Sequence, residues 1–253
     1  MRIGLLYPGE MGAAFGAALR ARGHEVFWVS SGRGSATHER ARRAGLAELG
    51  TFAELAAIQA DVVLSICPPH AALEVARSQA DFPGIYVDAN AVAPATVLTI
   101  ADIVPRCVDG SIIGSPPIDG PSARLYLSGS EADTVAELFT ATNVEARVVS
   151  AEIGAASALK MVYAAWTKGS AALLLAVRDA ALAAGVETDL RDEWQRSSPQ
   201  LLDRMAAANR SAIEKGWRWV GEMEEIAAFF ADVGVPDGFH LAAAEIYRQF
   251  PRG

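Results

Sequence analysis

The sequence predicts an α/β domain over residues 1–150, followed by a smaller all-helical domain over residues 151–253. In the first part, short β-branched runs alternate with helix-forming stretches, which is typical of a parallel sheet covered by helices. A glycine-rich turn separates the first of these runs from the first helical stretch. From residue 151 to 184 the chain is almost entirely helix-forming and has few charges, which indicates a helix buried in a larger body.

The predicted strands of the first domain are short runs rich in Val, Ile, Leu and aromatic residues. They cover residues 2–7, 25–30, 62–66, 85–88, 108–113, 124–127 and 145–149. Helices are predicted over residues 12–22 and 131–141, and Gly23 is a favoured residue for capping the end of the first one.

The second domain is predicted to contain one long helix over residues 151–184 and three shorter ones. Gly185 and the polar stretch after it end the long helix, and Gly216 and the Gly-Val-Pro at 234–236 separate the others. The shorter helices cover residues 201–215, 217–233 and 238–250. A small apolar helical domain with two close tryptophans favours a homodimer.

Composition excludes several classes of function. Hydrophobic residues make up 51% and charged residues 21%, so the chain can bury a sizeable core. The net charge of −8 argues against nucleic acid and anionic membranes as partners. The N-terminus is not a signal peptide, and later apolar stretches are too short to span a bilayer. Two cysteines do not make a disulfide scaffold, and four scattered histidines do not make a metal site. We therefore expect a cytoplasmic protein without a metal, acting on a small molecule.

The glycine turn runs from Gly4 to Gly16, between the first strand and the first helix. A dinucleotide pyrophosphate binds at such a turn, where the N–H groups of Gly9, Glu10, Met11 and Gly12 would point at the phosphates. The residue at the usual first glycine of the motif is Tyr7. The turn predicts a Rossmann-type dinucleotide-binding domain, although an ordinary strand–helix loop is the alternative.

The residues after the second strand indicate which dinucleotide binds. NAD-binding domains place a carboxylate there to hold the ribose 2′-hydroxyl. Here the strand ends with Ser30, Ser31, Gly32 and Arg33. Hydroxyls and a guanidinium suit a 2′-phosphate, so NADP is favoured over NAD. The alternative is a solvated loop with an unrelated arginine.

Five segments, in order, resemble the β-hydroxyacid dehydrogenases and 6-phosphogluconate dehydrogenases. They are 4–12, 61–68 (DVVLSICP), 87–94 (VDANAVAP), 109–115 (DGSIIGS) and 154–160 (GAASALK). The C-terminal part resembles a branch labelled phosphogluconate-dehydrogenase-like, which has a short helical domain. The chain lacks the K-x-x-H-N stretch of true 6-phosphogluconate dehydrogenases, so that label does not identify a substrate.

The resemblance implies a role for residues from both domains. Cys67, Pro68 and Asn90 would contact the cofactor, and Lys160 would transfer the proton. Substrate contacts would come from Asn90, Ile113, Gly114, Ser115, Ala164, Trp219 and His240. Trp219 or His240 would act across a dimer interface. Ala164 occupies the position of an asparagine that helps to hold the reacting oxygen in the family.

Lys160 is the only charged residue between Glu152 and Lys168. Hydride transfer at a carbinol carbon requires a matching proton transfer at oxygen, and a lysine can provide it if its pKa approaches neutrality. Burial among apolar neighbours lowers the pKa of a lysine because it disfavours the charged form. The alternative is a lysine that reaches the surface.

Three functions remain open from the sequence. The leading one is an NADP-dependent oxidoreductase that interconverts a small hydroxy acid and its oxo acid or semialdehyde. The second is an imine or enamine reductase, which Ala164 favours and Lys160 disfavours. The third is a non-catalytic NADP-binding regulatory protein, because a fold does not determine its function.

Overall fold

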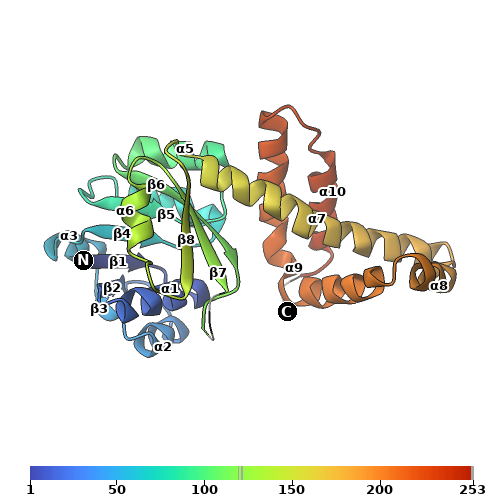
Figure 1. Ribbon diagram of the computed structural model, residues 1–253, viewed down its shortest axis with the longest axis horizontal. Helices are drawn as coiled ribbons and strands as arrows, with labels where there is room; N and C mark the ends of the chain where they lie inside the picture. Colours follow the sequence, from blue (N-terminus) through green and yellow to red (C-terminus); the bar gives the residue numbers. More distant parts are fainter. Residues whose placement is uncertain (119, 121, 252–253) are drawn as a thin grey trace. The chain divides into compact units, whose positions relative to one another are not determined.

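A computed structural model describes residues 1–118, 120 and 122–251. The chain divides into two compact units, Met1–Lys160 and Met161–Gly253. The division falls inside one long helix, α7 (Ala155–Ala183), which Figure 1 shows in yellow. The predicted fold class, an α/β domain followed by a long helix and a helical domain, is confirmed.

The first unit contains one eight-stranded sheet with the strand order β3-β2-β1-β4-β5-β6-β7-β8 (Figure 1). The strands are β1 (Arg2–Leu6), β2 (Glu25–Val29), β3 (Ala47–Leu49), β4 (Val62–Ser65), β5 (Ile85–Asp88), β6 (Cys107–Gly114), β7 (Ala123–Ser128) and β8 (Val144–Ser150). Strands β1 to β6 are parallel, in the order typical of dinucleotide-binding domains. The carboxyl ends of β1 and β4 mark the point at which the strand order reverses.

The prediction of a parallel sheet is wrong for its last two strands. Strand β7 pairs with β6 in the antiparallel direction, and β8 runs parallel to β7. Only residues 115–122 connect β6 to β7. A parallel connection needs a dozen residues or more, so a link this short forces the strand to reverse.

Helices cover both faces of this sheet. They are α1 (Glu10–Ala21), α2 (Ser35–Arg43), α3 (Phe52–Ala57), η1 (Pro69–Ala71), α4 (Ala72–Arg77), α5 (Pro94–Ile103) and α6 (Ala132–Glu137). One buried cluster contains side chains of α1, α2 and α6, and the other contains side chains of α3, α4 and α5. Two hydrophobic layers therefore enclose the sheet, as in a doubly wound domain.

Helix α1 forms the wall of the glycine turn. Its alanines favour helix, and Phe15, Ala18 and Leu19 are buried at helical spacing. Gly23 follows it with a φ of 96°, and its N–H donates to the carbonyl of Arg20. The predicted glycine cap is therefore confirmed.

The second unit consists of helices. Besides the end of α7, it contains α8 (Glu187–Ser197), α9 (Gln200–Asp232) and α10 (Gly238–Arg248). Its core is formed by side chains of α7, α9 and α10, among them Leu175, Met223, Ile226 and Tyr247.

Two predictions for this unit are wrong. Residues 201–215 and 217–233 do not form separate helices, because α9 continues through Gly216. A Cβ at Gly216 would lie 2.9 Å from Cβ of Phe250, so this glycine allows close packing and does not break the helix. The polar stretch after Gly185 forms α8, a helix that is rich in charged residues and has no buried residue.

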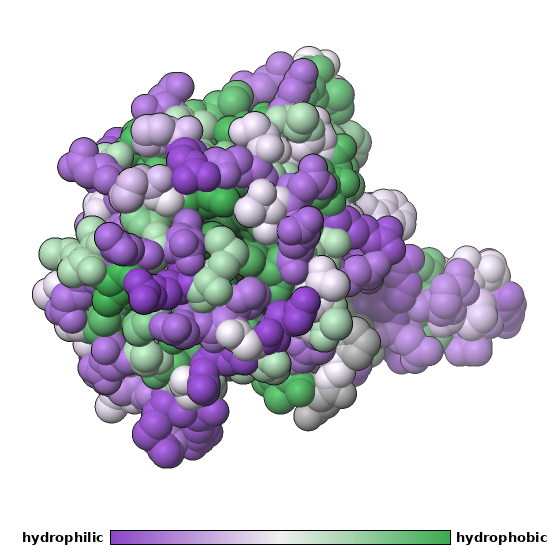
Figure 2. All heavy atoms as spheres, turned by 60° about the vertical axis from the view of Figure 1, so that its left-hand side comes forward, coloured by the Kyte–Doolittle hydropathy of each residue, from purple (hydrophilic) through white to green (hydrophobic). Residues whose placement is uncertain are grey.

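Figure 2 shows hydrophilic and hydrophobic residues interspersed over the face that it presents. Within residues 1–118, 120 and 122–251, no helix combines the length and the apolar composition needed to cross a membrane. In the same part of the chain, no three His, Cys, Asp or Glu side chains are grouped where they could hold a metal ion.

Candidate functional site

The glycine turn presents backbone donors at the start of α1. Gly9 precedes the helix in an extended conformation, and no side chain caps the N-terminal N–H groups. A Cβ placed on Gly9 would meet no atom within 4 Å, whereas a Cβ on Gly12 would lie 2.8 Å from the carbonyl oxygen of Tyr7. Gly9 thus leaves space beside the helix start, and Gly12 allows the helix to approach the strand. Free N–H groups beside open space are suited to a pyrophosphate.

Tyr7 has a backbone conformation that glycine adopts freely. Its φ is 66°, in the left-handed region, and its carbonyl accepts a 2.7 Å hydrogen bond from the N–H of Gly9. This conformation costs a residue with a Cβ about 1–2 kcal/mol. The turn therefore places a tyrosine side chain on a backbone conformation that favours glycine.

The loop after β2 reaches the same turn. The guanidinium carbon of Arg33 lies 3.5 Å from the centre of the Tyr7 ring. The Nε of Arg33 is buried and has no hydrogen-bond partner among the described residues. An orphaned guanidinium donor beside the glycine turn fits a phosphate group, so the residues present suit a nicotinamide dinucleotide.

The two predicted serines of this loop differ in their surroundings. The hydroxyl of Ser30 donates to the carbonyl of Leu49 at 3.1 Å and so helps to pair β2 with β3. Ser31 lies in a turn that is closed by a hydrogen bond from the N–H of Arg33 to the carbonyl of Ser30. The side chain of Ser31 is exposed. Of the two hydroxyls, that of Ser31 is the one available to a ligand.

Asn90 holds the carboxyl ends of β4 and β5 together. Its side-chain oxygen accepts from the N–H of Cys67 at 2.6 Å, and its amide donates to Asp88 at 2.7 Å and to Ser65 at 3.2 Å. Only 3% of Asn90 is exposed. Because both ends of its amide are bonded internally, Asn90 positions the loop containing Cys67 and Pro68.

Burial shifts the pKa of two groups in this region. It raises the pKa of Asp88 to about 7, although the two hydrogen bonds from Asn90 act in the opposite direction. It also raises the pKa of the Cys67 thiol to about 12, so this side chain stays protonated and is a poor nucleophile at neutral pH.

Lys160 lies beside the predicted substrate loop. Its Nζ donates to the carbonyl of Ile112 at 2.6 Å, one residue before Ile113. Burial lowers the pKa of Lys160 to about 8. Ile113 is buried, whereas Gly114 and Ser115 are exposed. The structure therefore brings a lysine with a pKa near neutrality to the end of β6.

The loop that follows β6 requires a glycine at position 114. Gly114 has a φ of 120°, and a Cβ there would lie 2.0 Å from the carbonyl oxygen of Ser122. The hydroxyl of Ser122 also donates to the carbonyl of Ser115 at 3.1 Å. These contacts fix the path of the chain where it leaves β6.

Asp109, on β6, anchors the start of α7. Its carboxylate is fully buried and accepts from the N–H of Gly154 and Ser157, each at 3.0 Å. It also accepts from the hydroxyls of Ser157 and Ser128, at 2.7 and 2.9 Å. Ser157 lies one helical turn before Lys160, so Asp109 sets the position of the lysine. Sequence reasoning missed this role, although a carboxylate inside a buried strand was the available signal.

In the helical unit, Trp219 belongs to a cluster around Lys168. Lys168 forms an ion pair with Glu222, and these side chains are only 19% and 18% exposed. The Nζ of Lys168 lies 5.6 Å from the centre of the Trp219 ring, which packs edge-on against Tyr247 at 5.1 Å. Tyr247 in turn donates its hydroxyl to the carbonyl of Lys168. Trp219 is thus held by contacts within this unit.

His240 and Ala164, the other two predicted substrate contacts of this unit, are buried in its core. The ring of His240 packs against Phe230 at 4.4 Å, and burial lowers the pKa of His240, which favours its neutral form. Ala164 is 2% exposed among apolar neighbours. Phe230 and Trp219 pack against the same hydrophobic core of this unit.

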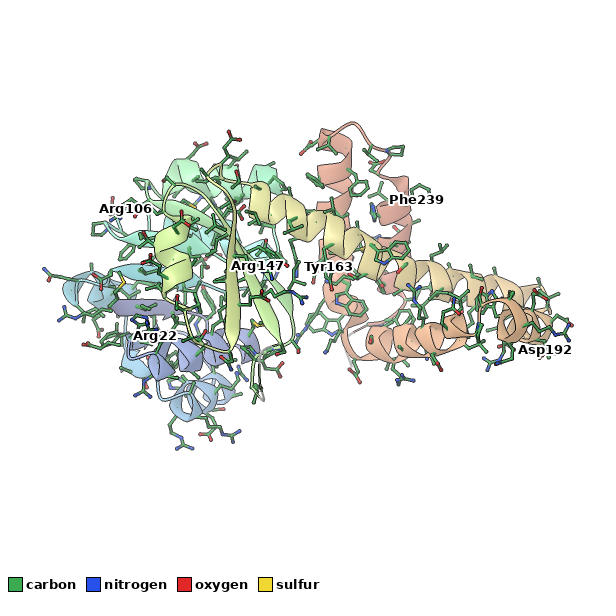
Figure 3. The ribbon with its side chains drawn as sticks, viewed as in Figure 1. Arg22, Arg106, Arg147, Tyr163, Asp192 and Phe239 are labelled. Carbon is green, nitrogen blue, oxygen red and sulfur yellow. The ribbon has the colours of Figure 1, made fainter. Side chains whose placement is uncertain are left out.

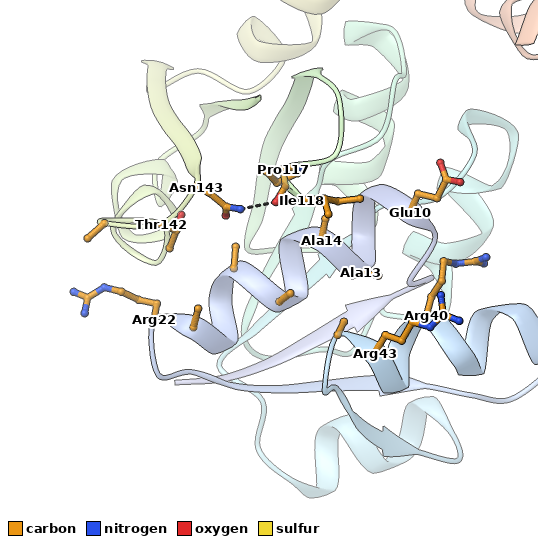
Figure 4. A pocket seen from close by; sticks show the side chains of 15 residues that line it. Glu10, Ala13, Ala14, Arg22, Arg40, Arg43, Pro117, Ile118, Thr142 and Asn143 are labelled. Carbon is orange, nitrogen blue, oxygen red and sulfur yellow. Dashed lines mark hydrogen bonds between the residues drawn. The ribbon is translucent and has the colours of Figure 1, made fainter. Parts of the chain in front are cut away.

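A groove of about 900 Å³ runs along the outer face of α1 (Figure 4). Alanines of α1 form its floor, Arg40 lies at its rim, and Pro117 and Asn143 form the opposite wall. The amide of Asn143 donates to the carbonyl of Pro117 across that wall. Among the described lining residues, Glu10 alone belongs to the predicted cofactor or substrate contacts, so those contacts do not converge in this groove.

Sequence comparison matches two families. Residues 2–92 match the family described as "NADP oxidoreductase coenzyme F420-dependent", and residues 181–250 match a domain of unknown function, DUF1932. An uncharacterized 28.5 kDa protein of Methanothermus fervidus is 30% identical over 193 residues, which are 75% of this chain and 74% of that protein.

Comparison with solved structures identifies proteins with the same fold. A conserved protein of unknown function, described as structurally similar to 3-hydroxyacid dehydrogenases, is 29% identical. Its TM-score is 0.76, with 99% of this chain and 96% of that chain covered. A 3-hydroxyisobutyrate dehydrogenase from Salmonella typhimurium shares the fold at 16% identity, with a TM-score of 0.73 over 98% and 93% of the chains. An imine reductase from Streptomyces aurantiacus does so at 19% identity, with a TM-score of 0.53 over 98% and 94%.

These matches confirm the resemblance seen in the five sequence segments. The chain belongs to the family of the Methanothermus fervidus protein, and it has a hydroxyacid dehydrogenase-like fold with an NADP oxidoreductase-type N-terminal domain and a C-terminal helical domain.

Proposed function

We propose that this protein is an NADP-dependent oxidoreductase that interconverts a small hydroxy acid and its oxo acid or semialdehyde. Residues 1–150 bind the cofactor, and residues 151–253 contribute to the substrate site. The observation that carries the proposal is the position of Lys160, which is partly buried and whose Nζ is held at the end of β6, directly before Ile113 and Gly114.

Bound NADP supplies or accepts the hydride in this reaction. Lys160 holds the proton that the substrate oxygen needs: in the reductive direction its ammonium form donates, and in the oxidative direction its amine form accepts. A pKa of about 8 makes both forms accessible near neutral pH. The N–H groups of Gly114 and Ser115 orient the substrate carboxylate. Asp109 positions Lys160 through the start of α7.

The cofactor proposal is NADP, with NAD less favoured. It is supported by the orphaned Nε of Arg33 beside the glycine turn and by the absence of a carboxylate at the end of β2, between Ser30 and Arg33. The family matched by residues 2–92 also carries NADP in its description.

The experiment follows NADPH oxidation with a panel of small 2-oxo acids, 3-oxo acids and semialdehydes. The wild type is compared with Lys160→Met, which removes the partly buried amine, and with Lys215→Met, which changes an exposed lysine. We expect turnover in the wild type and in Lys215→Met, and a loss of about 100-fold or more in Lys160→Met. Unchanged turnover in Lys160→Met would refute the role of Lys160. Binding of NADPH without turnover of any substrate would instead favour a regulatory protein.

One observation favours imine or enamine reduction as a second candidate. Ala164 is a buried alanine at the position where the family's asparagine would hold a substrate oxygen, and a C=N substrate does not need that contact. A cyclic imine in the same panel tests this. Faster turnover of the imine than of every oxo acid would favour the second candidate, although retention of Lys160 argues against it.

We also propose a homodimer in which a second copy of the chain covers exposed hydrophobic side chains of the helical unit. Trp166 and Leu173 on α7 are 67% and 64% exposed, and Phe239 on α10, labelled in Figure 3, is 81% exposed. Sedimentation equilibrium should give twice the chain mass, and Phe239→Asp should shift it toward the monomer. A wild type that is monomeric at micromolar concentration would refute the dimer.

A further inference from the structure

The glycine turn contains a residue that its backbone conformation disfavours. Tyr7 has a φ of 66°, which glycine adopts freely and which tyrosine adopts only when its surroundings impose it. A glycine would give the same turn without strain. Strained residues concentrate where a side chain has a task, so the ring of Tyr7 calls for an explanation beyond the turn itself.

The ring of Tyr7 supports one arginine. The guanidinium carbon of Arg33 lies 3.5 Å from the ring centre, which is the distance of a stacked cation–π contact. Arg33 also follows Gly32, whose φ is 71°, in a turn closed by the bond from the Arg33 N–H to the Ser30 carbonyl. The ring and the turn thus contact Arg33 from two sides, at its guanidinium and at its backbone.

Arg33 also has a buried donor that no described residue uses. Arg40 donates to the carbonyl of Pro8 at 3.3 Å and to the hydroxyl of Thr37 at 3.1 Å. The Nε of Arg33, in contrast, is buried without a hydrogen-bond partner among the described residues. A buried guanidinium donor without a partner indicates an acceptor that comes with a ligand.

We propose that Tyr7 is a specificity-determining residue: its ring holds the Arg33 guanidinium in the orientation that binds the 2′-phosphate of NADP. This inference rests on the proposed function, since it needs a dinucleotide at the glycine turn. The ligand chemistry is a phosphate monoester on a ribose, which a planar guanidinium binds through two parallel hydrogen bonds. Without the ring, Arg33 keeps its charge and loses its fixed orientation, so discrimination between NADPH and NADH falls.

Three substitutions separate the ring from the backbone. Tyr7→Phe keeps the stacking face. Tyr7→Gly removes the side chain and the strain together. Tyr7→Asn removes the ring and places a residue that tolerates the left-handed region, so it keeps the test open if the glycine variant folds poorly. Arg43→Ala is the control for charge, because Arg43 is exposed and paired with Glu39.

The measurement is the Kd for NADPH, for NADH and for adenosine 2′,5′-bisphosphate, followed by tryptophan fluorescence. The 2′,5′-bisphosphate contains the 2′-phosphate without the nicotinamide, so it reports this contact independently of turnover. We expect Tyr7→Phe and Arg43→Ala to bind like the wild type. Tyr7→Gly and Tyr7→Asn should lose about 10-fold in affinity for NADPH and for the bisphosphate, with NADH within about two-fold.

Two results would overturn the inference while leaving the proposed function intact. One is an unchanged ratio of NADPH to NADH affinity in both Tyr7→Gly and Tyr7→Asn. The other is tighter NADPH binding in these variants, which would show that the ring obstructs the cofactor. A wild type that binds neither dinucleotide would refute the proposed function itself, and the inference with it.

Discussion

Replacing Asp109 should destabilise the protein by an amount that depends on which atoms replace its carboxylate. The carboxylate is fully buried and accepts four hydrogen bonds, two from backbone N–H groups and two from hydroxyls. Asp109→Ala leaves these donors without an acceptor at the start of α7. A buried donor that loses its partner costs about 1–3 kcal/mol, and the two hydroxyls can rotate toward other acceptors. We therefore expect a loss of about 3–5 kcal/mol in the free energy of unfolding.

Asp109→Asn should lower the free energy of unfolding by less, about 1–2 kcal/mol. Three of the donors approach Oδ2 and one, the hydroxyl of Ser157, approaches Oδ1. An asparagine can place its oxygen at the Oδ2 position and its NH2 toward the Ser157 oxygen, which then accepts. The bonding pattern survives, and only the charge that strengthened it is lost.

Urea unfolding at pH 7, followed by tryptophan fluorescence, measures both losses. Ser111→Ala is the control, because Ser111 is a buried polar residue on the same strand whose hydroxyl has no hydrogen-bond partner among the described residues. Its loss should be below about 0.5 kcal/mol. A cost below about 1 kcal/mol for Asp109→Ala, or equal costs for the alanine and asparagine variants, would refute the anchoring role of Asp109.

Three further outcomes follow from local geometry. Gly216→Ala should lower the free energy of unfolding by about 1 kcal/mol, because the 2.9 Å approach to Phe250 outweighs the gain in helix propensity; a higher melting temperature would contradict this. Gly114→Ala should lower the free energy of unfolding, measured in urea, by about 3 kcal/mol or more, because the φ of Gly114 is 120° and an added Cβ would lie 2.0 Å from the carbonyl oxygen of Ser122. A loss below about 1 kcal/mol would show that the loop adapts. Burial raises the folded-state pKa of Asp88 to about 7, so the folded protein keeps a proton that the unfolded chain releases, and stability falls as pH rises from about 4 to about 7. Asp88→Asn should remove that part of the pH dependence, and an unchanged slope would refute the assignment.

The sequence predicted the first domain well because its signals are local. The strand that ends at Leu6, the open position of Gly9 and the cap at Gly23 each follow from residues close in the chain. The reversal of β7 was missed because it depends on the length of a connection, which hydrophobic periodicity does not record. Helix α8 was missed because it buries no residue.

The candidate site was harder to predict because its contacts are not local. Lys160 was identified through its apolar neighbours and the family motif, and its partner, the Ile112 carbonyl, is 48 residues away. The contacts of Asn90 with cofactor and substrate stay a prediction, and its amide bonds to Asp88, Ser65 and Cys67 follow from strand ends that only the fold brings together.

The pH dependence of kcat/KM for NADPH oxidation tests the central claim most directly. It is measured with an oxo acid that the panel identifies as a substrate, between pH 6 and pH 10, in the wild type. If Lys160 donates the proton, kcat/KM is constant at low pH and falls tenfold per pH unit above an apparent pKa of about 8. A profile without a break near pH 8, at full NADPH-dependent turnover, would contradict the account, because the proton would then come from a group other than Lys160.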